Sequence, residues 1–425
     1  MAKAHALWGK LPWAKLFEPA IRLAESGYRI NPILAGRIAT MQTVWRDFPE
    51  TQALYGKAQG DTVQNPALAQ TLRRIAERGP DEFYKGETAR AISAAVASAP
   101  RNPAQLTLGD LASYTAKERP AVCGRYRSWK ICGMGPPSSG ATTVLAILGM
   151  LEPYDVAAMG PGSFWSAHFL SEAARLAYAD RDRYVADPAR VDVPAGIVDP
   201  AYLRERARAI RATSSMVRAV PGMPPGATAG PVSVIDELSE LPATSHLSIV
   251  DADGGVVSMT TTIEDAFGSR LLAAGGFLLN NQLTDFSFRP TIDDVPVANR
   301  VEPGKRPRSS MAPTIAYDRA GRVAIVLGSP GGSAIINYVA KSLLGIVDWK
   351  LDPQAAADLP NFGSRNGPTE IEKGTEAESW KAALEAKGHE VRLIEMTSGT
   401  QAIVVTPQGY EGGADSRREG VAIGD

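Results

Sequence analysis

The segment that decides the fold reads Thr244-Ser-His-Leu-Ser-Ile-Val-Asp251, then Ala252-Asp-Gly-Gly255, then Val256-Val-Ser-Met-Thr-Thr-Thr-Ile263. The outer runs are rich in apolar and β-branched residues and predict two strands, and the Asp-Gly-Gly between them predicts a hairpin turn. Directly upstream, the proline- and glycine-rich stretch Ser214–Pro231 predicts either an exposed linker or a long surface loop inside one domain. The composition of the chain therefore changes where the hairpin begins, from proline- and glycine-rich to strand-forming.

The rest of the sequence alternates helical and extended patterns, which predicts an α/β fold. Two glycine-bearing turns, Pro136–Gly140 and Gly328–Ser333, each lead from a predicted strand into an apolar helix. The predicted helices are Leu16–Ala24, Ala67–Arg78, Gly86–Ser98, Thr107–Tyr114, Ala141–Leu151, Phe164–Tyr184, Ala334–Val347 and Ala377–Lys387. The further extended segments are Ala121–Cys132, Arg322–Leu327, Val391–Ile394 and Ala402–Val405.

Composition excludes several classes of function. The 425 residues include 45 Lys and Arg against 46 Asp and Glu, and a net charge of -1 predicts neither nucleic acid nor an anionic membrane surface as partner. No apolar run reaches the about 18 residues of a membrane-spanning helix. The start lacks the apolar core of a signal peptide, so the chain as written predicts a cytoplasmic location. Two cysteines, Cys123 and Cys132, form neither a disulfide framework nor a zinc site alone.

No G-x-S-x-G motif is present, which disfavours an α/β-hydrolase, and no H-E-x-x-H motif or other paired metal-ligand spacing is present. A Ser-His-Asp triad is possible with the 4 histidines but has no local support in the sequence. Thr244 offers another route. A backbone cut between Ala243 and Thr244 gives the threonine an α-amino group with a pKa of about 8, which can take the proton from its own hydroxyl. The alternative is a β-branched residue that only opens a strand. The 4 histidines are scattered, at His5, His168, His246 and His389.

Polar residues downstream of the hairpin have the chemistry of a substrate site. The adjacent glycines of Gly328–Ser333 expose backbone N–H groups at a helix start, which suits an oxyanion or a phosphate, or marks only a tight turn. Ser309 with Ser310, and Gln282 with Asp285, combine hydroxyls, an amide and a carboxylate that suit the head group of an amino acid. Taken alone, such residues are also typical of solvated turns.

These signals gain specificity in combination, in strings spread along the whole chain. The strings are Glu18-Pro-Ala-Ile-Arg-Leu-Ala-Glu-Ser-Gly27, Gly79-Pro-Asp-Glu-Phe-Tyr-Lys-Gly86, Pro136-Pro-Ser-Ser-Gly140, Ala177-Tyr-Ala-Asp-Arg181, Thr244–Asp251, Leu278-Leu-Asn-Asn-Gln282, Lys305-Arg-Pro-Arg-Ser-Ser-Met311 and Gly328-Ser-Pro-Gly-Gly-Ser333. In order and spacing they resemble the γ-glutamyltransferase family (γ-glutamyl transpeptidases) of N-terminal-nucleophile (Ntn) hydrolases.

The resemblance implies roles that form a catalytic set and a substrate-binding set. The implied catalytic residues are the nucleophile Thr244, freed by self-cleavage after Ala243, the assisting Thr262, and the oxyanion-hole glycines Gly331 and Gly332. The implied substrate-binding residues are Ser309 and Ser310 for the α-carboxylate of a γ-glutamyl group, Gln282 and Asp285 for its α-ammonium, and Glu264. A zwitterionic head group needs donors on one side and acceptors on the other, which agrees with these residue types.

Three departures from the family pattern bear on substrate choice and on completeness. Glu264 stands where many members carry Asn, and a carboxylate still accepts from an ammonium. The segment Ser287–Pro307 is shorter than the usual lid and has no Tyr, which predicts a more open site. The chain also begins inside the family pattern, so the resemblance implies an absent N-terminal stretch with central strands, an Arg for the substrate carboxylate and any export signal. A periplasmic or secreted location follows if that stretch exists.

The implied fold is the α/β Ntn-hydrolase sandwich, αββα, with its first strands and helices missing. Residues 1–243 correspond to the large subunit and 244–425 to the small one, which form a heterodimer after the cut. The implied reaction is acyl transfer from glutathione and other γ-glutamyl amides to water, amino acids or peptides, with no metal or organic cofactor. Two alternatives stay open: an acylase of cephalosporin or glutaryl amides in the same family, and an inactive truncated homologue.

Overall fold

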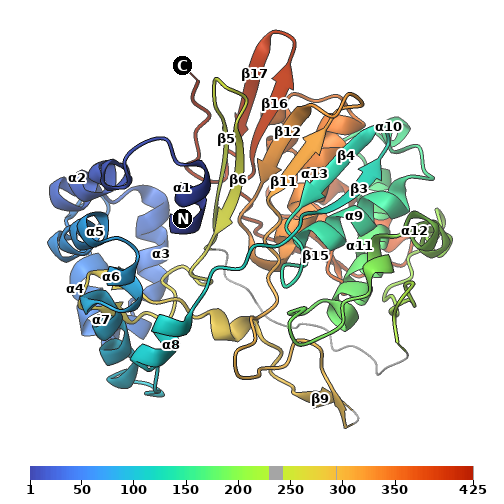
Figure 1. Cartoon of the computed structure of the whole chain (residues 1–425). Helices are drawn as coiled ribbons and strands as arrows, with labels where there is room; N and C mark the ends of the chain where they lie inside the picture. Colours follow the sequence, from blue (N-terminus) through green and yellow to red (C-terminus); the bar gives the residue numbers. More distant parts are fainter. Residues whose placement is uncertain (229–242, 293, 425) are drawn as a thin grey trace. The chain divides into compact units, whose positions relative to one another are not determined.

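The computed structural model describes residues 1–228, 243–292 and 294–424 (Figure 1). The chain divides into two compact units. The first comprises Met1–Glu118 and Asp265–Asn281, and the second comprises Arg119–Glu264 and Gln282–Asp425. The peptide bond at which the cut is predicted, between Ala243 and Thr244, lies inside the second unit.

The first unit is mainly helical. Several of its helices begin with a proline in the first turn, where the missing N–H costs no hydrogen bond. Trp45 is fully buried and packs edge-on against Phe267, whose segment returns to this unit after the hairpin. The helices are α1 Ala2–Trp8, α2 Glu18–Ser26, α3 Pro32–Met41, α4 Pro49–Tyr55, α5 Pro66–Arg78, α6 Asp81–Tyr84, α7 Glu87–Ala97 and α8 Leu108–Ser113; the short strand pairs are β1 Tyr28–Arg29 with β2 Thr62–Val63, and β7 Leu272–Ala273 with β8 Phe277–Leu278.

The second unit is built on a six-stranded antiparallel sheet with the order β17-β16-β12-β11-β4-β3. Ile325, Val326 and Leu327 of the central strand β12 are all fully buried, and because successive side chains point to opposite faces, the strand is covered on both. The strands of this sheet are β3 Val122–Tyr126, β4 Trp129–Gly133, β11 Thr314–Tyr317, β12 Val323–Gly328, β16 Gln401–Thr406 and β17 Gly409–Ala414.

Helices and a hairpin complete the layers around this sheet (Figure 1). The helices α9 Gly140–Leu151, α11 Phe164–Tyr184 and α13 Ile335–Val347 share the main core with the sheet. The hairpin of β5 Ser245–Val250 and β6 Val256–Thr261 packs against β12 and β16 and provides the second β layer. The α/β Ntn-hydrolase architecture predicted from the sequence is confirmed.

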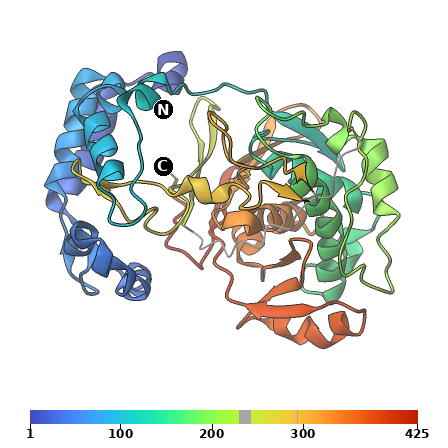
Figure 2. The same ribbon diagram turned by 90° about the horizontal axis from the view of Figure 1, so that it is seen from below.

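Smaller elements surround these layers in the second unit. A three-stranded sheet, β13-β14-β15, packs beside α11 and α13, and Figure 2 shows it in orange-red. Its strands are β13 Phe362–Ser364, β14 Thr369–Glu372 and β15 Val391–Ile394; the other elements are α10 Val156–Met159, α12 Pro200–Ala207, α14 Pro353–Asp358, α15 Lys381–Glu385, and the short pair β9 Thr291–Ile292 with β10 Val295–Pro296.

Most predicted elements lie within a few residues of their observed bounds, and α11 matches its predicted range. One expectation needs correction: the predicted helix Ala377–Lys387 is a 3-10 turn, Glu376–Trp380, followed by the short α15. Of the two alternatives left open for the proline- and glycine-rich stretch, the described residues 214–228 form the surface loop inside one unit, because Met216 N–H donates to the buried Glu172 and Ala219 exchanges two hydrogen bonds with Asn366. Residues 229–231 of that prediction lie outside the described residues.

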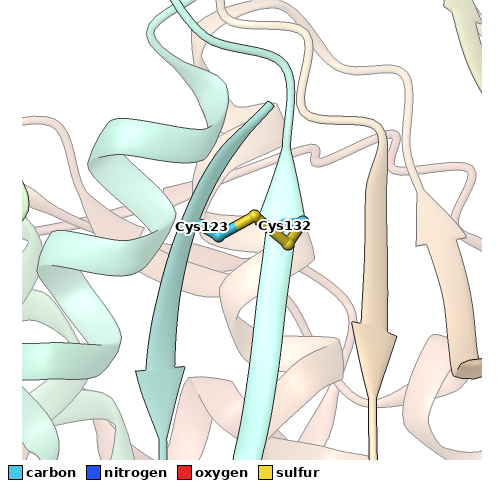
Figure 3. The surroundings of a disulfide bond; sticks show 2 residues. All are labelled: Cys123 and Cys132. Carbon is cyan, nitrogen blue, oxygen red and sulfur yellow. A yellow bond between two sulfur atoms is a disulfide. The ribbon is translucent and has the colours of Figure 1, made fainter. Parts of the chain in front are cut away.

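The two cysteines, which the sequence left without a role, are joined. Cys123 of β3 and Cys132 of β4 are direct cross-strand partners and form a disulfide (Figure 3). One bridge is not a framework, but the pairing itself was missed. In the described part of the chain, none of the helices combines the length and apolar character needed to cross a membrane.

Candidate active site

The topology of the second unit brings the predicted site residues to one end of the sheet. Thr314, which begins β11, pairs with Leu327 near the end of β12 and with Gly133 at the end of β4. In the hairpin, Ser245 at the start of β5 pairs with Thr261 at the end of β6. The loops that follow or precede these strand ends carry the predicted nucleophile, the serine pair and the glycine turn.

The predicted nucleophile and its predicted helper are in contact. Thr244 Oγ1 donates to Thr262 Oγ1 at 3.1 Å, and Thr244 is only 5% exposed. Thr262 Oγ1 also accepts the backbone N–H of Glu264 at 2.8 Å. Glu264 has a φ of 75°, a left-handed conformation that Asn adopts more readily than Glu. The three predicted residues thus form one cluster around the hairpin end.

The C-terminal segment holds the main chain of the nucleophile. Arg418 Nη1 donates to the carbonyl of Thr244 at 3.1 Å, while Nε and Nη2 of the same guanidinium donate to the carbonyl of Thr397 at 3.1 and 3.0 Å. The packing is close, because a Cβ placed on Gly399 would lie 2.7 Å from both Arg418 Cδ and Pro330 Cγ. Arg418 therefore fixes the backbone at Thr244 beside the glycine turn.

The glycine turn Gly328–Ser333 has a backbone that other residues would strain. Gly331 and Gly332 have φ values of 137° and 59°, and a Cβ on Gly331 would lie 2.4 Å from the ring of Tyr338. Gly332 begins a 3-10 turn that continues into α13, so the first N–H groups here lack partners within the helix. Backbone N–H groups at a helix start suit an anionic oxygen.

The serine pair is held by the turn that precedes α9. Ser309 N–H donates to the carbonyl of Pro137 at 3.1 Å, and Ser139 returns two bonds to the Ser309 carbonyl, from its N–H at 2.7 Å and its hydroxyl at 2.8 Å. Gly140 is required for this contact, because a Cβ there would lie 2.3 Å from the carbonyl oxygen of Met311. The two loops therefore position Ser309 and Ser310 as one rigid piece.

The predicted ammonium-binding residues share a 3-10 turn, Gln282–Asp285. The Gln282 amide donates to the Asp285 carboxylate. Asn299 is fully buried and links this turn to the serine loop: its amide nitrogen donates to the Asp285 carbonyl at 2.8 Å, and its amide oxygen accepts Arg308 N–H at 2.9 Å. The predicted short lid therefore contains a side chain that connects both ends of the head-group site.

The histidines do not form a catalytic triad in the described structure. Burial lowers the pKa of His246 to about 4, and its ring bonds the hydroxyls of Thr260 and Ser248 at 2.8 and 3.1 Å. His5 bonds the carbonyl of Leu11 in the first unit. Thr244 is thus a buried hydroxyl whose partner is another hydroxyl, which agrees with a nucleophile that carries its own base.

A buried group of His168, Glu172 and His389 has the residue types of a metal site. The nitrogen and oxygen atoms that could bind a metal already have hydrogen-bond partners within the protein. His168 Nε2 faces the carbonyl of Arg211 at 2.8 Å and must donate, so His168 Nδ1 accepts the proton of His389 Nε2 at 2.6 Å. Glu172 accepts from Ser215 and Met216, and Arg175 lies 3.4 Å from it. The group fits a closed hydrogen-bond network rather than a cation.

Sequence reasoning missed three residues that support the site: Arg181, Asn299 and Arg418. Two of them stand in strings or segments that drew attention for other reasons, Arg181 in Ala177–Arg181 and Asn299 in the short lid. The signal for Arg181 was a cation inside an otherwise buried helix, which requires polar partners. Arg418 gave no signal, because its partner is a backbone carbonyl distant in sequence.

Comparisons with known proteins agree over the whole chain. The model of the family described as Gamma-glutamyltranspeptidase matches residues 1–425. The glutathione hydrolase proenzyme of Escherichia coli (strain K12) is 37% identical over 430 residues, which cover 97% of this chain and 71% of that protein. The Acylase ACY 1 proenzyme of Pseudomonas sp. (strain V22) is 33% identical, over 99% and 73%. The crystal structure of cephalosporin acylase from Bacillus halodurans superposes with a TM-score of 0.84 at 25% identity, over 99% and 76%.

Proposed function

The chain belongs to the γ-glutamyltranspeptidase family, and we propose that it cleaves γ-glutamyl amides such as glutathione by acyl transfer through Thr244. The observation that carries the proposal is the buried hydroxyl pair of Thr244 and Thr262 at the start of the hairpin. Relatives named glutathione hydrolases support this class of acyl donor.

Maturation uses the same hydroxyl in this proposal. Thr244 Oγ attacks the carbonyl carbon of Ala243, the peptide C–N bond breaks as an ester forms, and the released α-amine takes the hydroxyl proton. Water then hydrolyses the ester, which leaves a carboxylate on Ala243 and a threonine with a free amine and a free hydroxyl. The products are residues 1–243 and 244–425.

The two products would stay together as a heterodimer because they share one sheet. Strand β4 precedes the cut and pairs with β11, which follows it, in a register that joins Thr314 to Gly133 and Tyr317 to Lys130. The main core likewise combines α9 and α11 from one piece with α13 from the other. Separating the pieces would expose this core and an unpaired strand edge.

Turnover repeats the chemistry on a substrate amide. The α-amine of Thr244 accepts the hydroxyl proton, Oγ attacks the γ-carbonyl, and the N–H groups of Gly331 and Gly332 stabilise the tetrahedral oxyanion. Collapse of this intermediate breaks the C–N bond, and the leaving amine receives the proton. Water or the amino group of an acceptor then attacks the acyl-enzyme, and the free Thr244 returns. This scheme uses no metal or organic cofactor.

The site would recognise the head group of the donor by the charges on its α-carboxylate and α-ammonium. Ser309 and Ser310 donate to its α-carboxylate, while Asp285 and Glu264 accept from its α-ammonium, with Gln282 orienting Asp285. A bond to a charged group contributes about 1.5–3 kcal/mol, against about 1 kcal/mol for a neutral pair. Such differences are enough to select zwitterionic donors over uncharged amides.

A second candidate function is hydrolysis of glutaryl or cephalosporin amides. One observation favours it: relatives named acylases match nearly the whole chain. A glutaryl group keeps the carboxylate of a γ-glutamyl group but lacks its ammonium. The two functions therefore differ in how the Asp285 side of the site is used.

Parallel kinetics on γ-glutamyl 4-nitroanilide and glutaryl 4-nitroanilide tests the proposal, with Thr244→Ala as the inactive control. The proposal predicts a higher kcat/KM for the γ-glutamyl donor. Preference for the glutaryl donor would support the acylase function instead. Absence of turnover of both donors, in protein that has been cut before Thr244, would contradict both and favour an inactive homologue.

The disulfide bears on location. A bridge between Cys123, which is exposed, and Cys132 forms in oxidising compartments and is rare in the cytosol. Of the two locations considered from the sequence, we therefore propose the periplasmic or secreted one rather than the cytoplasmic one predicted from the start of the chain as written. Thiol labelling of protein isolated from its native cells tests this: two reactive thiols without reductant would contradict it.

A further inference from the structure

Helix α11 carries a string that the proposed mechanism leaves unused, Ala177-Tyr-Ala-Asp-Arg181. The helix faces both halves of the site. The Tyr178 hydroxyl donates to the carbonyl of Ser333 in the glycine turn, and one turn later Arg181 reaches the serine loop. Arg181 is only 3% exposed, and a buried guanidinium is costly unless its donors are satisfied.

Each branch of the Arg181 guanidinium has a polar partner in this loop system. Nε donates to Ser139 Oγ at 2.9 Å, Nη2 to Ser310 Oγ at 2.7 Å, and Nη1 to the Asp182 carboxylate at 2.6 Å. The same Asp182 oxygen lies 3.3 Å from Nη2 of Arg308, which is also buried. Two buried cations thus share this carboxylate directly behind the serine pair.

The direction of these hydrogen bonds fixes where the serine protons can go. Arginine only donates, so Ser310 Oγ accepts from Arg181 and its own proton must be given to another acceptor. Ser309 Oγ likewise accepts the N–H of Met311 at 3.1 Å. Among the described residues, neither hydroxyl reaches an acceptor for its proton. Both hydroxyls are therefore set to donate to a ligand, and the nearby positive charge favours an anionic one.

We propose that Arg181 is a positioning residue that holds the Ser310 hydroxyl as a donor toward the carboxylate of the substrate head group. The inference rests on the proposed function for the identity of that head group. Arg181 acts through Ser310 and does not touch the substrate. Its loss removes the donor that holds the Ser310 oxygen in this orientation and removes a buried positive charge behind the carboxylate.

Two matched donors separate this role from a general effect on folding. γ-Glutamyl 4-nitroanilide carries the α-carboxylate, and 4-aminobutyryl 4-nitroanilide is the same donor without it. For Arg181→Met we expect KM for the γ-glutamyl donor to rise roughly 10- to 100-fold, as for loss of a charge-assisted hydrogen bond, with kcat changed less than about threefold. For the 4-aminobutyryl donor we expect KM to change less than about threefold.

The control is Arg175→Met, because Arg175 is a fully buried arginine of the same helix whose partners are the Val217 carbonyl, Glu172 and Thr369. This variant should treat the two donors alike. The effect of Arg181→Met should also shrink to within about threefold in a Ser310→Ala background, since the two residues act as one unit. Equal losses on both donors, or full additivity with Ser310→Ala, would overturn the proposal.

Two further measurements keep the inference testable. If Arg181→Met does not fold, Arg181→Lys retains the charge without the planar fork, and an increase in KM specific to the γ-glutamyl donor is expected. If the unchanged protein does not turn over γ-glutamyl amides, the proposed function fails, and ligand binding decides the role of Arg181. L-Glutamate should then raise the Tm of the unchanged protein more than 4-aminobutyrate does. A difference of the same size in Arg181→Met would contradict the role.

Discussion

The two sides of the candidate active site consist of different kinds of chemical group. The nucleophile side consists of the hydroxyls of Thr244 and Thr262 and the backbone of Gly331 and Gly332, all electrically neutral. The head-group side contains the Asp285 carboxylate and a buried network in which Arg181 lies behind Ser310. The charged Arg418 on the nucleophile side bonds only main-chain carbonyls in the contacts described, so the groups proposed to act on the reacting atoms are neutral dipoles, whereas the head-group side uses charged side chains.

This difference predicts how kinetic effects divide. Interactions realised only in the transition state raise kcat, whereas those made equally in the bound substrate act on KM. We therefore expect changes on the nucleophile side to reduce kcat and changes on the head-group side to raise KM. The predictions below test this division, beginning with the largest expected effect.

Removal of the nucleophile should abolish both reactions of the nucleophile side. Thr244→Ala removes the hydroxyl that is proposed to attack first the backbone and then the substrate, so we expect no splitting of the chain and no measurable turnover. Gel electrophoresis and a nitroanilide assay measure the two outcomes. Thr244→Ser keeps a hydroxyl and should retain both reactions, and splitting of the alanine variant would exclude Thr244 as the attacking group.

Loss of the oxyanion glycine should be the next largest effect. Gly331→Ala adds a Cβ 2.4 Å from the Tyr338 ring and shifts the turn, so we expect kcat to fall by about 10²- to 10³-fold with little change in KM. Gly321→Ala is the control, because Gly321 also has a left-handed φ of 78° but has open space around its Cβ position. A similar fall in kcat for the control would mean that backbone strain alone explains the effect.

A change on the head-group side should instead depend on the donor. Asp285→Asn weakens the contact with an ammonium but not with a carboxylate, so kcat/KM should fall roughly tenfold or more for γ-glutamyl amides and less for glutaryl amides. Steady-state kinetics on both donors provides the comparison. Equal losses would show that Asp285 does not read the amino group.

The smallest effect concerns stability rather than catalysis, in the buried histidines remote from both roles. Burial, together with Arg175, lowers the pKa of His389 to about 3, and burial also lowers the pKa of His168. The unfolded chain takes up these protons near pH 6.5, whereas the folded protein does not, so the free energy of unfolding should decrease as the pH falls from about 7 toward 4.

Thermal unfolding across this pH range measures the effect. His389→Gln keeps an N–H that can donate to His168 but removes one titrating group, so its Tm should decline less steeply with falling pH than that of the unchanged protein. Parallel curves would show that the histidine pair does not contribute to acid sensitivity. Activity measured at pH 7 should be unaffected, because neither residue belongs to the site.

Much of the architecture could be predicted because short stretches of sequence determine its individual helices and turns. The apolar spacing of Phe164–Tyr184 and the turn residues Ala252–Gly255 specify a helix and a hairpin without reference to distant residues. The course of residues 214–228 could not be predicted, since proline and glycine content describes a loop but not the partners Glu172 and Asn366 that hold it. The cross-strand disulfide was missed for the same reason, because it depends on strand register.

The same distinction, between local sequence patterns and contacts with distant residues, applies to the residues of the site. Thr244, Ser309, Ser310 and the glycine turn stand in recognisable strings, whereas Arg418 and Asn299 act on backbone groups that any residue would offer. A side chain that binds a distant carbonyl leaves no pattern in the sequence. The supporting residues therefore required the three-dimensional structure, and they are the ones that set the positions of the predicted ones.

The central claim, that Thr244 becomes an N-terminal nucleophile, is tested most directly by N-terminal sequencing of the smaller piece of the purified protein. We predict a fragment that begins Thr-Ser-His-Leu-Ser and extends to the C-terminus, and that carries the acyl group on this first threonine when a slow γ-glutamyl donor is added. A folded protein that remains uncut, or a fragment that begins at any other residue, would contradict the account.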